Sequence, residues 1–208
     1  MLPMSSYVAN FALPTKSLSE AEQSALLTVT GQRRGAFRDH MIFSFALGTG
    51  LREHELVALD VGDVVDEAGR VRRRICLRTF KRASKQPAAQ EVLLSESLRV
   101  KARKFIDWKR RSGQSVEPTA PLFVGRSTTR LSTRQVRHMF RVWQQRAGFD
   151  KFYTFHALRH TGCTAIYRST KDILITQSFA RHKDIRTTMR YAHPDEADLL
   201  RAIQGLRC

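Results

Sequence analysis

Apolar residues recur at the spacing of an α-helix in three long segments of this chain, and glycine follows each segment. Such a stripe buries one face of a helix, and glycine commonly ends one. The stripes are Phe37, Met41, Ile42 and Phe45; Leu98, Ala102, Phe105 and Ile106; and Val136, Met139, Phe140 and Trp143. Residues 71–80 instead alternate as a strand does, with residues 90–94 as the expected hairpin partner. The sequence therefore predicts a mainly α fold with a small antiparallel β-sheet, which is an α+β class.

Local signals mark where other helices begin. Residues 17–20 and 132–135 fit the capping box, in which a serine and an acid or amide three residues later satisfy the first backbone N–H groups. Further helices are expected after Thr154 and over residues 173–179. We expect residues 1–16 to be a flexible lead-in and residues 17–208 to form one domain. That domain would end in an amphipathic tail helix at about residues 195–204.

The charge balance narrows the function. The chain has 36 Lys and Arg residues against 19 Asp and Glu residues, a formal net charge of +17, which requires an anionic partner. The basic residues are spread through segments that also carry apolar periodicity, so they indicate a folded, phosphate-facing surface rather than a charged tail. Ribosomal proteins, regulators, nucleases and peripheral membrane proteins can all be this basic, so charge alone does not choose among them.

Membrane, secreted and metal-bound classes are not expected. No apolar run approaches the ~18–20 residues of a membrane span, and the N-terminus lacks the features of a signal peptide, so the expected location is the cytosol. The three cysteines are far apart in the sequence and form no CxxC pair. They are expected to be reduced thiols rather than a disulfide framework or a zinc site.

Four short segments contain residues suited to chemistry. Arg52 follows a glycine turn at the start of a helix, and Lys81 lies in the expected hairpin turn. His156 and Arg159 are three residues apart, so they are neighbours on a helix, where the arginine disfavours a second positive charge on the imidazole. His182 precedes Tyr191 by nine residues. Each segment alone is more typical of surface or packing residues.

Taken together, in this order and at this spacing, the four segments resemble the catalytic domain of the tyrosine recombinase (phage integrase) family. That domain reads Arg, Lys, His-x-x-Arg, His or Trp, and Tyr from N- to C-terminus. The resemblance covers about residues 17–203, and the T-T-x-x-Y-x-H ending over residues 187–193 is its most specific part. It implies that the catalytic residues are Arg52, Lys81, His156, Arg159, His182 and Tyr191, with Lys85 as an alternative to Lys81.

The chain differs from the family pattern at three places. Arg181 stands where the family usually has glycine, immediately before the residue that matches His182. The hairpin, residues 80–85, lacks both glycines of the usual G-K-G-x-K. Typical members also carry a helical core-binding domain ahead of the catalytic domain. The chain is therefore expected to be either an excised catalytic domain or a short recombinase of the promoter-inverting kind.

The resemblance implies a reaction without metal or other cofactor. Tyr191 would attack a DNA phosphorus, giving a 3′-phosphotyrosine and a free 5′-hydroxyl. Arg52 and Arg159 would stabilise the charge on the non-bridging oxygens, to which His182 would also hydrogen-bond. His156 would act as base and the hairpin lysine would protonate the leaving oxygen. Glu55 either holds the Arg52 guanidinium or is a solvated helix carboxylate.

The implied partner is double-stranded DNA, with no membrane. Recombinases of this family act as tetramers on DNA, and exchange of the tail at residues 195–204 between protomers would assemble a homotetramer, with accessory DNA-bending proteins possible. Two other functions remain open at this point. A type IB topoisomerase uses a similar residue set to relax DNA as a monomer, and a DNA-binding regulator can keep the fold without activity.

Overall fold

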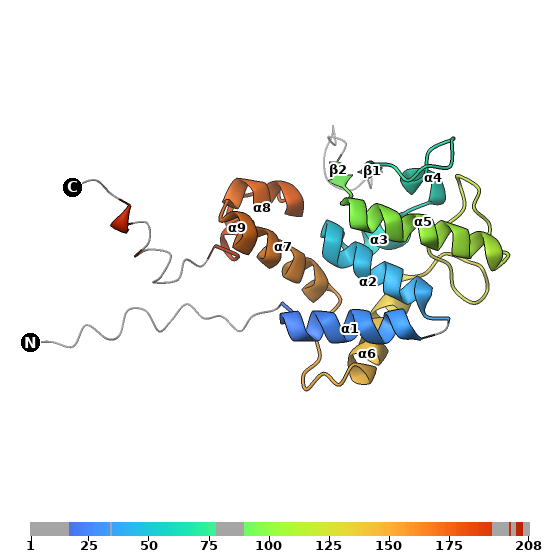
Figure 1. The fold of residues 1–208 in the computed structure, drawn as a ribbon, viewed down its shortest axis with the longest axis horizontal. Helices are drawn as coiled ribbons and strands as arrows, with labels where there is room; N and C mark the ends of the chain where they lie inside the picture. Colours follow the sequence, from blue (N-terminus) through green and yellow to red (C-terminus); the bar gives the residue numbers. More distant parts are fainter. Residues whose placement is uncertain (1–16, 34, 78–89, 193–199, 201–202, 206–208) are drawn as a thin grey trace, which may run out of the picture. The chain divides into compact units, whose positions relative to one another are not determined.

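The computed structural model describes residues 17–33, 35–77, 90–192, 200 and 203–205 (Figure 1). They belong to two compact units, Lys16–Gly162 and Cys163–Cys208 together with Met1–Thr15. The helices and strands are α1 Glu20–Gln32, α2 Phe37–Thr49, α3 Glu53–Ala58, α4 Val61–Val64, β1 Arg74–Leu77, β2 Gln90–Leu93, α5 Glu96–Arg111, α6 Thr133–Arg146, α7 His156–Thr170, α8 Ile173–Ala180 and α9 Arg186–Met189. This mainly helical architecture with one small sheet confirms the predicted fold class.

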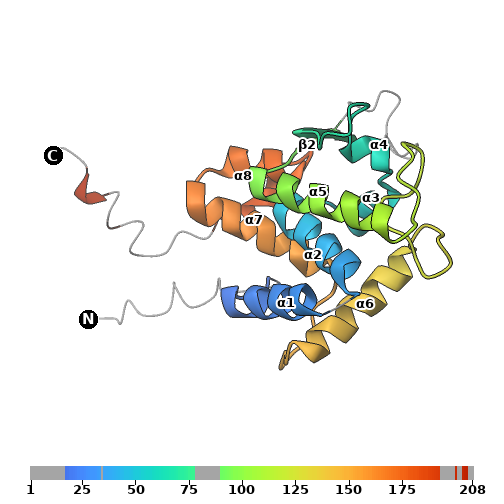
Figure 2. The same cartoon turned by 45° about the vertical axis from the view of Figure 1, so that its right-hand side comes forward.

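The unit Lys16–Gly162 is built around α2. Its central residues 41–46 are buried on every side, which makes α2 the central helix, and it lies between α1 and α5 (Figures 1 and 2). Phe43 of α2 contacts Phe140 of α6, and Phe140 contacts Phe155 just before α7, with ring centroids 5.5 and 5.6 Å apart. This aromatic chain fixes the start of α7 against the core.

The first helix begins two residues later than the sequence suggested. Ser19, not Ser17, caps α1: its Oγ accepts from the Glu22 backbone N–H at 3.2 Å, and the Glu22 carboxylate accepts from the Ser19 N–H at 2.7 Å. Leu18 is buried and donates its N–H to the Thr161 hydroxyl at 2.8 Å. That contact with a distant segment holds Leu18 outside the helix.

The predicted hairpin is present, and its first strand begins at Arg74 rather than at Val71. β1 and β2 pair antiparallel, with Ile75 opposite Val92, and both of these side chains are buried. Val71 forms an isolated bridge to Val65 instead of extending β1. Residues 78–89 lie outside the described residues, and so do most of the expected tail helix and the expected lead-in.

The second unit contains the C-terminal part of α7 together with α8 and α9. Asp172 caps α8, since its Oδ1 accepts from the backbone N–H groups of Leu174 and Ile175 at 2.7 and 3.0 Å. The helix ends at Arg181, which has φ 52° and ψ 44°, in the left-handed region. Glycine adopts this conformation with the least strain, so an arginine at the end of α8 is unusual. No helix in the described part of the chain is long and apolar enough to cross a membrane.

Replacing Arg181 with glycine is expected to stabilise the protein by about 0.5–1 kcal/mol. An L-residue in the left-handed region is strained by about 1–2 kcal/mol, and the extra chain entropy of glycine offsets part of the gain. Arg181→Ala is the matched control because it removes the same side chain and keeps Cβ. Urea unfolding should give the glycine variant the higher midpoint, and an equal midpoint for both variants would contradict the explanation.

Candidate active site

Arg52 is placed by the turn between α2 and α3. Gly50 ends α2 in the left-handed conformation, with φ 59°, and donates its N–H to the Ala46 carbonyl at 3.2 Å. Arg52 is then the N-cap of α3, and one Glu55 oxygen accepts from its backbone N–H at 2.8 Å. The other Glu55 oxygen pairs with the Arg52 guanidinium, also at 2.8 Å. The Glu55 side chain is 7% exposed and that of Arg52 33%, so a buried carboxylate orients a partly exposed cation.

Arg159 is brought to the same turn from the other end of the sequence. It lies on α7, is 2% exposed, and donates from Nη1 to the Gly50 carbonyl. Gly50 precedes Arg52 by two residues, so the segments that carry the two predicted catalytic arginines are hydrogen-bonded to each other. A buried guanidinium held in this way is a preorganised donor, which favours binding of a phosphate.

His156 begins α7 and is exposed, whereas Arg159 on the next turn is buried. The His156 and His160 rings are perpendicular to each other, with their centroids 4.6 Å apart and their planes at 88°. His160 is 8% exposed and had no assigned role in the sequence analysis. The His156 side chain is therefore accessible to solvent, and its ring packs against the buried His160.

The other two described candidates, His182 and Tyr191, lie in the second unit. Tyr191 is 8% exposed and packs with Cys163 and Ala180. Its ring is nearly parallel to the His182 ring: the angle between the two planes is 6°, and the ring centroids are 6.3 Å apart. His182 Nδ1 lies 2.9 Å from the Thr188 hydroxyl. The structure therefore brings His182 and Tyr191 together, and Thr188 joins them.

The predicted residues thus fall into two groups. Arg52, Glu55, His156 and Arg159 belong to the unit Lys16–Gly162, and His182 and Tyr191 belong to the unit that contains Cys163–Cys208. Lys81, like its alternative Lys85, lies outside the described residues.

Sequence reasoning missed two arginines that hold α3 at its ends. Arg137 of α6 forms an ion pair with Glu53, the first residue of α3, and these hydrogen bonds raise the pKa of Arg137 above its usual value. Arg130 donates to the carbonyls of Val57 and Leu59 at 2.9 and 3.0 Å, at the other end of α3. Each contact joins residues more than 70 positions apart in the sequence, so no local sequence motif predicts them.

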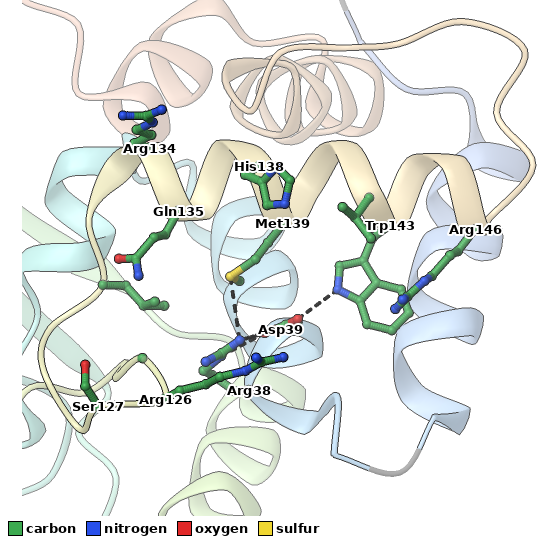
Figure 3. Close-up of a pocket in the computed structure, with 13 residues that line it drawn as sticks. Arg38, Asp39, Arg126, Ser127, Arg134, Gln135, His138, Met139, Trp143 and Arg146 are labelled. Atoms are coloured by element: carbon green, nitrogen blue, oxygen red, sulfur yellow. Dashed lines mark hydrogen bonds and ion pairs between the residues drawn. The ribbon is translucent and has the colours of Figure 1, made fainter.

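A basic cavity of about 710 Å³ lies beside α6 (Figure 3). Four arginines line it: Arg38, Arg126, Arg134 and Arg146. Its buried carboxylate, Asp39, accepts from Trp143 Nε1 at 2.8 Å and pairs with Arg38 at the same distance. Among the described candidates, none of Arg52, His156, Arg159, His182 and Tyr191 lines this cavity.

No group of three or more His, Cys, Asp or Glu side chains that could hold a metal ion occurs among the residues that the structure describes. Two of the three cysteines can be placed: Cys76 is exposed, Cys163 is buried, and neither forms a disulfide.

The chain is similar in sequence to known recombinases over most of its length. The chain is 32% identical over 186 residues to tyrosine recombinase XerC of Vibrio vulnificus (strain YJ016), covering 86% of this chain and 54% of the relative. It is 28% identical over 185 residues to XerC of Proteus mirabilis, with 86% and 55% covered. The chain thus spans about half the length of these curated relatives.

Solved structures show the same fold. The crystal structure of XerA recombinase superposes with a TM-score of 0.71 at 26% identity, covering 92% of this chain and 64% of that one. The catalytic domain of bacteriophage HP1 integrase matches at 21% identity with a TM-score of 0.58, covering 91% and 94%. The model of the phage integrase family matches residues 16–198. The chain therefore belongs to the phage integrase family.

Proposed function

We propose that this chain is the catalytic domain of a site-specific tyrosine recombinase, which cleaves and rejoins DNA strands through a 3′-phosphotyrosine at Tyr191. The observation that carries the proposal is the link from Arg159 to the Gly50 carbonyl, beside Arg52. It joins two guanidinium-bearing segments that are more than 100 residues apart and suits them to one phosphate. The chain spans about half the length of its XerC relatives, and we propose that it shares their recombinase activity.

In the proposed reaction the Tyr191 oxygen forms a bond to phosphorus as the bond to the 5′-oxygen breaks. Negative charge grows on the non-bridging oxygens, which Arg52 and Arg159 bind with paired hydrogen bonds and His182 with one. Glu55 acts through Arg52 by fixing its guanidinium at 2.8 Å.

Two proton transfers accompany the cleavage step. His156 takes the phenol proton, because a free tyrosine with a pKa of ~10 is almost entirely protonated at neutral pH. Lys81, or Lys85, gives a proton to the leaving 5′-oxygen. Rejoining is the reverse attack by a 5′-hydroxyl, so the energy of the phosphodiester bond is kept and neither a metal ion nor ATP is needed.

A nicked suicide substrate tests this function, because the short 5′ fragment diffuses away and traps the covalent intermediate. We expect the chain to form a DNA adduct that survives denaturing electrophoresis, with no ATP and with EDTA present. Absence of an adduct under all conditions would favour a regulator that only binds DNA. A strict Mg²⁺ requirement for cleavage would contradict the mechanism.

The proposed partner is double-stranded DNA, which would place the protein in the cytoplasm. A solved protein of the same fold, the XerH site-specific recombinase, is bound to its difH substrate; it is 20% identical to this chain, with a TM-score of 0.72. Support from this chain comes from its net charge of +17 and from the four arginines of the basic cavity.

Binding to duplex DNA is expected to weaken steeply with salt, with a log–log slope of about −0.9 per neutralised phosphate. The double variant Arg126→Gln, Arg134→Gln, in the basic cavity, should make this slope shallower by roughly 2 units. Arg70→Gln is the control, since Arg70 is already paired with Asp66 at 3.0 Å. Titration of a labelled duplex at several salt concentrations measures the slopes. An unchanged slope in the double variant would remove the cavity from the DNA surface.

We also propose that four copies assemble on DNA by exchanging their C-terminal tails. Accessory DNA-bending proteins would be further partners of this assembly. The support is apolar exposure in the second unit, at Leu174, Ile175 and Met189, and on the tail, at Leu200 and Ile203. Such surfaces in a charged protein favour burial against another chain. Light scattering of the DNA-bound protein should show a tetramer. The double variant Leu200→Ser, Ile203→Ser should bind DNA only as monomers.

A further inference from the structure

A buried threonine links the two candidate catalytic residues of the second unit. Thr188 is fully buried, and its Oγ1 lies 2.9 Å from His182 Nδ1. The main chain of His182 is fixed separately: its N–H donates to the Gln177 carbonyl at 3.2 Å, and its carbonyl accepts from Gln177 Nε2 at 3.1 Å. Since Gln177 anchors the main chain, the contact with the threonine hydroxyl restrains the rotation of the ring.

The same threonine also holds the main chain of the nucleophile. Tyr191 donates its N–H to the Thr188 carbonyl at 2.9 Å, one turn after Thr188. The Tyr191 ring lies parallel to the His182 ring, and the tyrosine packs on Cys163 and Ala180. Thr188 therefore touches His182 with its side chain and Tyr191 with its backbone, which fixes the spacing between them.

We propose that Thr188 is a positioning residue for strand cleavage, which donates its hydroxyl proton to His182 Nδ1 and so makes Nε2 the protonated nitrogen, the one that would bind a phosphate oxygen. The proposal rests on the proposed recombinase function. The two nitrogens of a neutral imidazole have opposite roles, and the partner of one sets the role of the other. A donor at Nδ1 leaves Nε2 as the N–H that can bind a non-bridging oxygen. Thr188 itself does not touch DNA.

Two substitutions separate the hydroxyl from the shape of the side chain. Thr188→Val keeps the branched shape and removes the donor, whereas Thr188→Ser keeps the donor. We expect Thr188→Val to slow adduct formation on the suicide substrate about 2- to 10-fold, the range of one net hydrogen bond between neutral groups. Thr188→Ser should retain most of the wild-type rate. Thr187→Val, on the same helix, is the matched control and should react at the wild-type rate.

A double-mutant cycle tests whether Thr188 acts through His182. Both Thr188→Val and the wild-type threonine are placed in a His182→Ala background. If Thr188 works by orienting the ring, the valine change has no further effect once the ring is gone. An equal slowing in both backgrounds would overturn the proposal, because Thr188 would then act without His182.

The ring itself gives a readout that does not depend on recombination. Nitrogen-15 spectra of labelled histidine, with the His182 signals identified by their loss in His182→Gln, should show Nδ1 as a hydrogen-bonded acceptor and Nε2 protonated. In Thr188→Val the Nδ1 signal should move, and in Thr188→Ser it should stay. A protonated Nδ1 in the neutral wild-type protein would refute the assigned direction. These spectra still decide the Thr188 contact if the wild-type chain forms no adduct, so failure of the two proposals is distinguishable.

Discussion

Replacing Tyr191 with phenylalanine is expected to abolish the covalent protein–DNA adduct while leaving DNA affinity nearly unchanged. The change removes one oxygen, the proposed nucleophile, and no positive charge. The ring remains, so the packing of residue 191 on Cys163 and Ala180 is kept. Adduct formation on the suicide substrate and a duplex titration at one salt concentration measure the two effects.

Tyr167 provides the control for this experiment, because it is partly buried against the same cluster as Tyr191. Tyr167→Phe also removes one phenolic oxygen, and it should form the adduct at the wild-type rate. An adduct at wild-type rate in Tyr191→Phe would overturn the assignment of the nucleophile. Loss of the adduct in Tyr167→Phe as well would show that the cluster, not a particular oxygen, had been disturbed.

The parts of the fold that the sequence predicted are those set by local interactions. The Ser132 cap and the α5 stripe are readable because capping boxes and helical spacing involve residues only three or four positions apart. The start of α1 was misplaced because Ser17–Glu20 and Ser19–Glu22 both fit the motif. The contact from Leu18 to Thr161, 143 positions away, decides between them.

The same distinction applies to the candidate site. The pair Arg52–Glu55 was among the interpretations of the sequence because its members are three residues apart on a short helix. The bonds from Arg159 to Gly50 and from Arg137 to Glu53 join distant segments, so they appear only in the folded chain. The four-residue helices α4 and α9 were also missed, since one turn is too short to show a periodicity.

The burial of Thr188 and its contact with His182 could not be predicted from the sequence motif. The T-T-x-x-Y spacing drew attention to the tyrosine, but nothing in it tells that the second threonine is buried and bonded to His182. A buried hydroxyl beside a histidine is a signal only once burial is known, because an exposed threonine on the same helix would bind water instead. The positioning of a predicted catalytic residue is thus harder to predict than its identity.

Loss of either candidate arginine is expected to slow adduct formation by roughly 10²–10³, the usual effect of removing one preorganised donor to a transition-state oxyanion. Loss of His182 should have a smaller effect, because an arginine offers two charge-assisted hydrogen bonds and the imidazole offers one. The appropriate changes differ. Arg52 is partly exposed and tolerates Arg52→Ala, whereas Arg159 is buried, so Arg159→Lys keeps a charge there while removing the planar fork.

The control is Arg110→Ala, which removes an exposed arginine paired with Asp107 on α5 and should leave the cleavage rate unchanged. Urea unfolding of each variant shows whether a slow rate reflects lost structure, which matters most for Arg159 because its bond to Gly50 also ties α7 to the α2–α3 turn. Comparable losses for Arg52→Ala and Arg110→Ala would contradict a catalytic role for Arg52. A wild-type rate for Arg159→Lys would show that charge alone suffices at that position, since lysine supplies the charge without the two parallel N–H groups.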